Sequence, residues 1–142
     1  MDKKKIEEQI VSPHLFQGLH PEEVHKLMKQ GLVVHFQKDE VIFYQGSIGS
    51  QVYLIIQGSI GIYQGEKEIV QLGEGEIFGE MALLTKQPRS ATAKAIMDSS
   101  LLVFSETSFE RLLTKKTAVR LLLNIIHILC NRLKNTNQSI ST

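Results

Sequence analysis

The stretch FGEMALLTKQPRSA, residues 78–91, interrupts a series of strand-like runs and decides how the chain folds. Strand-like residues precede Gly79 and follow Ser90, so this stretch is an insertion between two strands. Its centre, MALLTK, consists of strong helix formers but is shorter than two helical turns. A helix this short is marginal by itself. We therefore expect a short helix that depends on packing or on a ligand.

The two ends of this insertion form a candidate ligand site. The first amides of a helix have no intrahelical partners and attract an anion, and Gly79 has no side chain to block the approach. Arg89 offers a planar fork of donors that grips phosphate bidentately, and Ser90 adds a hydroxyl. Glu80 would repel phosphate, so its partner should be a donor such as a sugar hydroxyl. The pattern predicts a small nucleotide as the ligand.

Short strand-like runs fill the chain from residue 32 to residue 105. Turn signals at Gly46, Gly58, Gly65 and Gly75 separate many of them, a pattern typical of a sandwich or barrel. We expect strands within LVVHF, EVIFY, QVYLIIQ, SIGIYQ, KEIVQL, SATAKAI and SSLLVFS.

Helical sequence flanks this region on both sides. HPEEVHKLMKQG has Pro21 early, acids in its first turn and Gly31 after its end, which are start and stop signals. ETSFERLLTKK and AVRLLLNIIHILCNRLKN predict helices after the strands. The expected fold class is α+β, a β-roll flanked by N- and C-terminal helices. We expect one domain over residues 1–136, made of a helical segment (1–31), the roll (32–105) and C-terminal helices (106–136), with a frayed tail at 137–142.

Composition favours a single globular domain without a nucleic-acid-binding footprint. The chain has 142 residues and a formal net charge of +1, and its only dense basic run is Lys3-Lys4-Lys5. Cys130 is the single cysteine, which fits a reducing compartment. The N-terminal sequence lacks the apolar core of a signal peptide, and no apolar run is long enough for a membrane span. We expect a cytoplasmic protein.

The residues 78–91 resemble the phosphate-binding cassette of the cyclic nucleotide-binding domain family. FQKDEVIFYQGSIGSQVYLIIQGSIGIY is similar to that family's strand-and-glycine pattern, LGEGEIFGE to the start of its cassette, and LFQGLHPEEVHKLM to its N-terminal helical segment. The resemblance covers most of the chain. It implies a regulatory module that binds a cyclic mononucleotide and signals through its C-terminal helix. In relatives, threonine after the arginine accompanies cGMP, so Ser90 favours cAMP over cGMP.

The resemblance also implies a role for each matching residue. Glu80 is expected to bind the ribose 2′-hydroxyl, Arg89 the cyclic phosphate, and Ser90 to assist Arg89. The other expected binding residues belong to the cassette, where backbone amides contact phosphate and sugar, to the base pocket, and to the C-terminal helix that reaches the adenine. They are Phe78, Gly79, Met81, Ala82 and Ala91, then Ile62, Val70 and Leu72, then Thr136 and Asn137. No metal is expected.

The C-terminal helix carries more apolar surface than a lone helix on a small domain needs. A stripe expected to pack on the roll comprises Leu122, Ile125, Ile126, Leu129 and Leu133, and Leu121 and Ile128 extend the apolar surface round a further face. Either the roll clamps the helix from two sides or the helix forms a dimer contact, and we favour a homodimer. The effector is expected to be another protein or a fused output domain. We expect no direct DNA binding, because no helix-turn-helix follows Leu133.

Other interpretations remain beside this one. The fold can also serve as a ligand-independent protein-interaction domain. Glu80 and Arg89 can form an ordinary ion pair that caps a short helix. Gly73, Gly75 and Gly79 lack the strand–turn–long helix context of a dinucleotide loop. An enzyme is not expected, because no nucleophile, base and orienting group can be assigned from spacing.

Overall fold

A computed structural model describes residue 18 and residues 20–80, 85–111 and 115–141. Its helices are α2 (Pro21–Gln30), α4 (Glu106–Arg111) and α5 (Lys115–Ser141). Its strands are β1 (Leu32–Phe36), β2 (Val41–Phe43), β3 (Val52–Gln57), β4 (Ile60–Gln64), β5 (Lys67–Leu72), β6 (Ile77–Phe78), β7 (Thr92–Ala95) and β8 (Ser99–Phe104).

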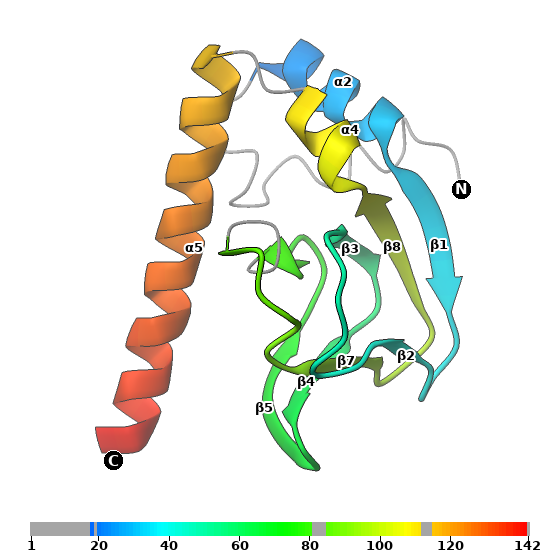
Figure 1. Cartoon of the computed structure of the whole chain (residues 1–142), viewed down its shortest axis with the longest axis vertical. Coiled ribbons are helices and arrows are strands. Elements are labelled where there is room, and N and C mark those ends of the chain that lie inside the picture. The colour runs from blue at the N-terminus through cyan, green and yellow to red at the C-terminus, as the bar shows by residue number, and fades with distance from the viewer. Residues whose placement is uncertain (1–17, 19, 81–84, 112–114, 142) are drawn as a thin grey trace.

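The strands form two antiparallel sheets that face each other. The first sheet has the order β1-β8-β3-β6 and the second β2-β7-β4-β5. The central pairing joins β3 to β8, with Leu54 opposite Leu102. Helices α2, α4 and α5 lie outside the roll (Figure 1). The predicted β-roll with flanking helices is confirmed.

Two hydrophobic cores result from this layering. The inter-sheet core fills the roll and contains Tyr53, Ile55, Ile60, Leu72, Phe78, Ala93, Ala95 and Leu101. The helix-side core lies between the first sheet and the helices and contains Met28, Leu54, Ile56, Ile77, Leu102, Phe104 and Ile125. Alternate residues of β3 and β8 therefore belong to different cores, as the period of two in a strand requires. Both strands are buried on both faces.

Helix α2 begins and ends where its sequence signals predict. His20 precedes it in an extended conformation, Pro21 is its first residue, and the His20 amide donates to the Glu23 carboxylate at 3.4 Å. Gly31 follows its last residue with a φ of −94°, which any residue adopts. A Cβ there would lie 2.8 Å from the Leu102 side chain, so glycine is needed for close packing on the first sheet.

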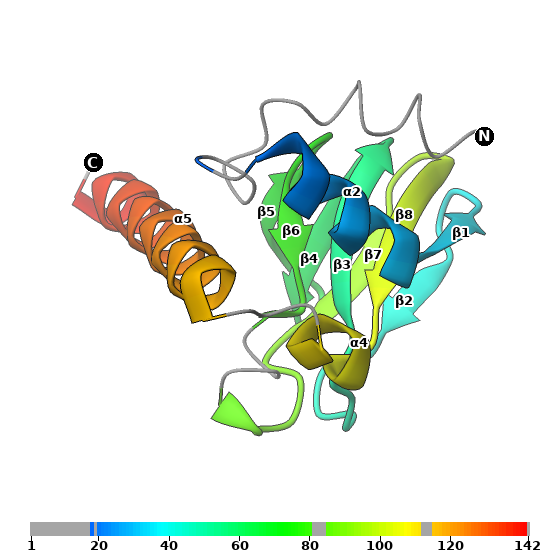
Figure 2. The same ribbon diagram turned by 90° about the horizontal axis from the view of Figure 1, so that it is seen from above.

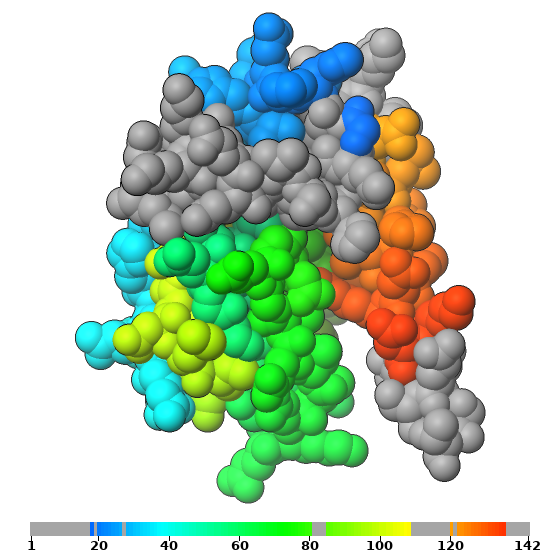
Figure 3. Space-filling model, turned by 180° about the vertical axis from the view of Figure 1, so that it is seen from behind, coloured from blue at the N-terminus to red at the C-terminus, as the bar shows by residue number. Residues whose placement is uncertain are grey.

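Helix α5 packs on the roll through only part of the predicted stripe, namely Ile125 and Leu129. Ile125 is buried, and Ile128 and Leu129 pack against the helix-side core. Leu122, Ile126 and Leu133 are 42%, 54% and 63% exposed, so the prediction that they pack on the roll is wrong. Leu121 lies among the residues whose side chains the structure does not describe. In the space-filling view α5 lies along one edge of the molecule (Figure 3).

The same helix is also longer than the sequence predicts, because it extends to Ser141. Among the described residues, no helix meets the length and hydropathy needed to cross a bilayer.

Candidate functional site

Gly79 directly follows β6 and is the second residue of the stretch 78–91. Its φ is +84°, in the region that favours glycine. A Cβ at this position would lie 2.9 Å from both Arg89 Nη1 and the Gln51 carbonyl oxygen. Glycine is therefore required both by the backbone conformation and by the close approach of Arg89. Glu80 and Thr85 are helical. Most of the short helix predicted between them falls on residues 81–84, which lie outside the described residues.

Arg89 is a buried guanidinium whose hydrogen-bond acceptors are neutral. The residue is 5% exposed, and it donates from Nη1 to the Gly79 carbonyl at 2.8 Å and from Nη2 to the Gln51 carbonyl at 2.9 Å. Its Cζ lies 4.2 Å from the centre of the Phe43 ring. Nε has no hydrogen-bond partner among the residues that the structure describes. Burial lowers the pKa of Arg89, and nearby Tyr53 and Glu80 oppose that shift.

The loop between β2 and β3 holds the backbone of Arg89 in place. The Arg89 amide donates to the Ser47 carbonyl, and the Gly46 amide donates to the Arg89 carbonyl, each at 2.8 Å. Gly49 of the same loop faces the guanidinium, because a Cβ there would lie 3.2 Å from Nη2. The arginine is thus positioned by contacts with the backbone of this loop and of Gly79.

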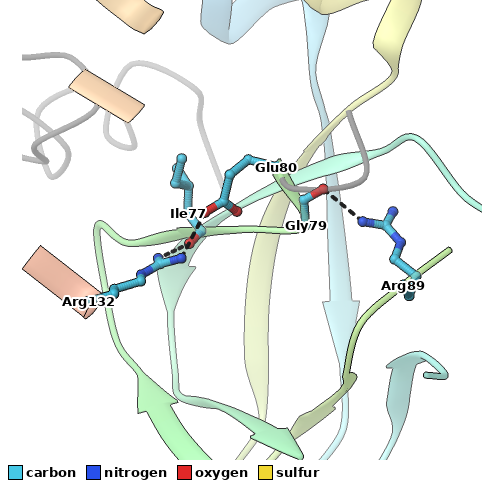
Figure 4. Close-up of polar contacts among 5 residues, drawn as sticks. All are labelled: Ile77, Gly79, Glu80, Arg89 and Arg132. Atoms are coloured by element: carbon cyan, nitrogen blue, oxygen red, sulfur yellow. Dashed lines mark hydrogen bonds and ion pairs between the residues drawn. The ribbon is translucent and has the colours of Figure 1, made fainter. Parts of the chain in front are cut away.

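Glu80 is also buried, but its carboxylate points away from Arg89. It is 1% exposed, and Arg132 of α5 donates to its Oε1 from Nη1 at 2.8 Å. The other terminal nitrogen of Arg132 donates to the Ile77 carbonyl. Figure 4 shows the carboxylate of Glu80 and the side chain of Arg89 on opposite sides of Gly79. The interpretation of Glu80 and Arg89 as a mutual ion pair is therefore wrong.

The pKa of Glu80 reflects this environment. Burial raises it above the ordinary value of 4.5, and the positive charge of Arg132 and the hydrogen bonds to the carboxylate lower it by less. The Arg132 side chain is 29% exposed, so one partner of the pair remains in contact with water.

The other predicted site residues differ in how far they are exposed. Phe78 is 2% exposed and stacks on Tyr53 at 5.0 Å between ring centres, so its side chain belongs to the inter-sheet core. Ser90 is exposed and Ala91 is half-buried. Met81 and Ala82 lie outside the described residues. Thr136 and Asn137 belong to α5, but their side chains are not described.

The expected base pocket lies on β4 and β5. Ile62 is directly opposite Val70, and Leu72 is opposite Ile60, so these side chains share the inner face of the second sheet. Leu72 is 3% exposed within the inter-sheet core, whereas Ile62 is half-buried and Val70 is 40% exposed. Of the three, Val70 and Ile62 are accessible to a ligand in this structure.

Sequence reasoning missed Arg132 as a site residue. Its signal was present, because Arg132 continues the spacing of Ile125, Ile128 and Leu129, which pack on the roll. A cation at the next position of an apolar stripe faces the same neighbour as the stripe. Among the described residues, no group of histidine, cysteine, aspartate and glutamate is arranged to hold a metal ion.

Comparisons with known proteins agree on one family. Residues 33–116 match the family model described as "Cyclic nucleotide-binding domain". The chain is 33% identical over 128 residues to the "Cyclic AMP receptor protein" of Thermus thermophilus, with 87% of this chain and 58% of that protein covered. It is 37% identical over 82 residues to the "cGMP-dependent protein kinase" of Eimeria tenella, with 58% and 8% covered. The chain thus spans under two thirds of the length of these relatives.

Solved structures give the same result for the fold. The crystal structure of the Thermus thermophilus catabolite activator protein superimposes with a TM-score of 0.76 at 32% identity, covering 90% of this chain and 62% of that one. A structure described as "Sp-2Cl-cAMPS bound to PKAR CBD2" has a TM-score of 0.81 at 24% identity, covering 98% and 91%.

Proposed function

Because this chain belongs to the cyclic nucleotide-binding domain family, we propose that it binds a cyclic mononucleotide between Glu80 and Arg89 and acts as a regulatory module. cAMP is the favoured ligand and cGMP the alternative. The module has no catalytic role in this proposal. It reports ligand occupancy through α5 to an effector protein or a fused output domain.

The observation that carries this proposal is that Arg89 is buried with no ion-pair contact among the described residues. A buried guanidinium is costly unless an opposite charge or a full set of acceptors offsets its loss of water. Arg89 has two backbone carbonyls, an aromatic face and an Nε without a partner among the described residues. A cyclic phosphate supplies the missing negative charge with the planar geometry that a guanidinium prefers.

Glu80 supports the sugar part of the ligand. Its Oε1 accepts from Arg132, and a carboxylate has two oxygens that accept several hydrogen bonds. A ribose 2′-hydroxyl can therefore donate to Glu80 while the contact with Arg132 persists. The phosphate and the ribose would then contact side chains on the two sides of Gly79. One cyclic mononucleotide carries both groups.

The preference for cAMP rests on Ser90 and on the relatives. The Thermus thermophilus relative is named a cyclic AMP receptor protein, and the Eimeria tenella relative is named a cGMP-dependent kinase. The former resembles the chain over a longer segment. Ser90 keeps a hydroxyl beside Arg89 but lacks the threonine methyl.

The contact from Arg132 supports a role for α5 in signalling. The Arg132 side chain of α5 donates to Glu80, the residue proposed to bind the ribose, and also to the carbonyl of Ile77, which precedes the cassette. A ligand that shifts Glu80 therefore acts on α5 without an intervening residue. We also propose that α5 contacts a second copy of the chain. The single cysteine fits the proposed cytoplasmic location.

A thermal-shift titration with cAMP, cGMP and AMP tests the proposal. At one hundred times its dissociation constant, a ligand adds about 2.7 kcal/mol of stability, which for a chain of this size raises Tm by roughly 5–10 °C. We expect this rise with cAMP, a smaller one with cGMP at equal concentration and none with AMP. Arg89→Ala should abolish the shift. Incubation with cAMP should leave the nucleotide intact.

One observation favours the second candidate, a ligand-independent interaction domain. Glu80 already has a cationic partner within the chain, so its burial does not by itself require a ligand. The absence of any shift with millimolar cyclic nucleotide would select this alternative.

A further inference from the structure

An aromatic side chain of β2 covers one face of the Arg89 guanidinium. Arg89 Cζ lies 4.2 Å from the centre of the Phe43 ring and 6.0 Å from that of the Tyr53 ring. Among the described residues, these are the two rings that Arg89 faces. A cation is attracted to an aromatic face when it lies within about 6 Å of the ring centre. Phe43 is therefore the ring in closest contact with the residue proposed to bind phosphate.

A β-bulge directs the Phe43 ring towards this guanidinium. Val41 of β2 is opposite Lys94 of β7, and Phe43, two residues later, is opposite Ala93. Because Ala93 and Lys94 are adjacent, Ile42 is an extra residue in β2. In a regular strand successive side chains point to opposite faces of the sheet, but Ile42 and Phe43 both pack against the inter-sheet core. Bulges next to functional sites re-aim a side chain in this way.

Two further rings hold Phe43 in this orientation. Its ring centre lies 5.8 Å from that of Tyr53 on β3 and 6.0 Å from that of Phe78 on β6. Tyr53 and Phe78 stack on each other with their centres 5.0 Å apart. Aromatic side chains attract one another at these distances. Since β2 belongs to the second sheet and β3 and β6 belong to the first, the Phe43 ring is held from across the roll.

We propose that Phe43 is a positioning residue for Arg89, because its ring face fixes the plane in which the guanidinium presents its N–H groups to a phosphate. The inference rests on the proposed function and adds to it a residue that acts through Arg89. A guanidinium donates within its own plane, and two of its donors already bind the carbonyls of Gly79 and Gln51. A ring that covers one face of the plane leaves the other donors open to the ligand.

The two halves of the proposed site are held from opposite sides of the molecule. Seen from above, β2 and α5 lie on opposite sides of the roll (Figure 2). Strand β2 supplies Phe43, which contacts Arg89. Helix α5 supplies Arg132, which donates to Glu80. Replacing Phe43 should therefore disturb the phosphate half of the site without releasing Glu80 from Arg132.

Calorimetry with cAMP tests this role. Phe43→Leu should weaken binding about fivefold or more, because affinity falls with the fraction of molecules in which Arg89 is correctly placed and the lost contact is a cation–π pair. Phe43→Tyr keeps the ring face and should bind within about twofold of the parent. The matched control is Phe36→Leu, at a ring of β1 that packs against the same core, which should lower Tm but leave the affinity unchanged. Parental affinity in Phe43→Leu, or equal losses with leucine and tyrosine, would overturn the proposal.

The NMR signal of the Arg89 Nε proton tests the contact without any nucleotide. Ring currents move protons above an aromatic face upfield, so this signal should lie upfield of ordinary arginine signals in the parent, and its disappearance in Arg89→Lys assigns it. The upfield shift should vanish in Phe43→Leu and persist in Phe36→Leu. An ordinary shift in the parent would overturn the proposal even if every variant misfolded. A shifted signal in a protein that binds no cyclic nucleotide would support the contact and refute the proposed function.

Discussion

Replacing Arg132 with methionine is expected to destabilise the protein by about 2–3 kcal/mol at neutral pH. Removing one partner of a fully buried ion pair costs about 3–5 kcal/mol, because the remaining charge is left without compensation. Glu80 is 1% exposed and has Arg132 as its ion-pair partner at 2.8 Å. The Arg132 side chain is 29% exposed, so water can replace part of the contact and the lower magnitude applies. Methionine keeps an unbranched apolar stem in place of the aliphatic part of the arginine, so much of its packing on the roll is preserved.

The loss should depend on pH in a defined direction. Burial raises the pKa of Glu80 above 4.5, and Arg132 opposes that rise, so removing Arg132 raises the pKa further. For a carboxyl with a raised pKa, the contribution to stability is fully present below 4.5 and is lost as pH rises through the folded-state pKa. The variant therefore loses more than the parent at neutral pH. Below pH 4.5 the difference should shrink to about 1 kcal/mol, the value of the lost hydrogen bond to Ile77.

Urea denaturation of both proteins at pH 7 and pH 4 measures these free energies of unfolding. Adding Glu80→Gln to Arg132→Met should recover at least half of the loss at pH 7, because the amide carries no charge. The same double variant should show no pH dependence from this site. A loss that is equal at the two pH values, or that Glu80→Gln fails to reduce, would refute the reasoning from buried charge.

Three further predictions concern ligand binding. Arg89→Ala should weaken cyclic nucleotide binding roughly ten- to a hundredfold, since a charge-assisted pair is worth about 1.5–3 kcal/mol, and Arg89→Lys should recover only part; calorimetry that finds parental affinity in the alanine variant contradicts the phosphate assignment. Glu80→Ala and a 2′-deoxy ligand should weaken binding by similar amounts and, applied together, far less than additively; full additivity would mean that Glu80 does not touch the sugar. Ligand should slow amide exchange both in the cassette and in residues 125–137. Ending the chain after Leu123 should weaken binding, while circular dichroism should still show the strands of the roll. Protection confined to the cassette would mean that α5 does not transmit ligand binding.

The strands were predictable because their sequences agree with their environments. LVVHF and KEIVQL coincide with β1 and β5, and the predicted turn residues Gly58 and Gly65 have positive φ. At Gly58 a Cβ would lie 2.1 Å from Ser99 Oγ, so the glycine is required by packing as well as by conformation. Strand β6 was not predicted, because its two residues lie within the glycine-rich LGEGEIFGE and too few residues show a period.

The partners of the two site residues were not predictable in the same way. Glu80 is 52 positions from Arg132, and no local pattern relates two residues that the fold alone brings together. The prediction of which side of α5 packs on the roll was wrong in part for a related reason. Apolar residues occur on several sides of that helix, so their spacing in the sequence does not define one inward face. Only the position of the roll makes Ile125 buried and Ile126 exposed.

The division of the interior into two cores means that the molecule can open in two stages. Detaching α2 and α5 uncovers Leu54, Ile56 and Leu102 on the outer face of the first sheet, while the inter-sheet core stays closed. Such partial opening requires less free energy than global unfolding. It also presents an apolar sheet surface to proteases and to other partly open copies. A ligand that strengthens the contact between Glu80 and Arg132 would hold this surface covered, so nucleotide binding would prolong the lifetime of the protein as well as alter its signal.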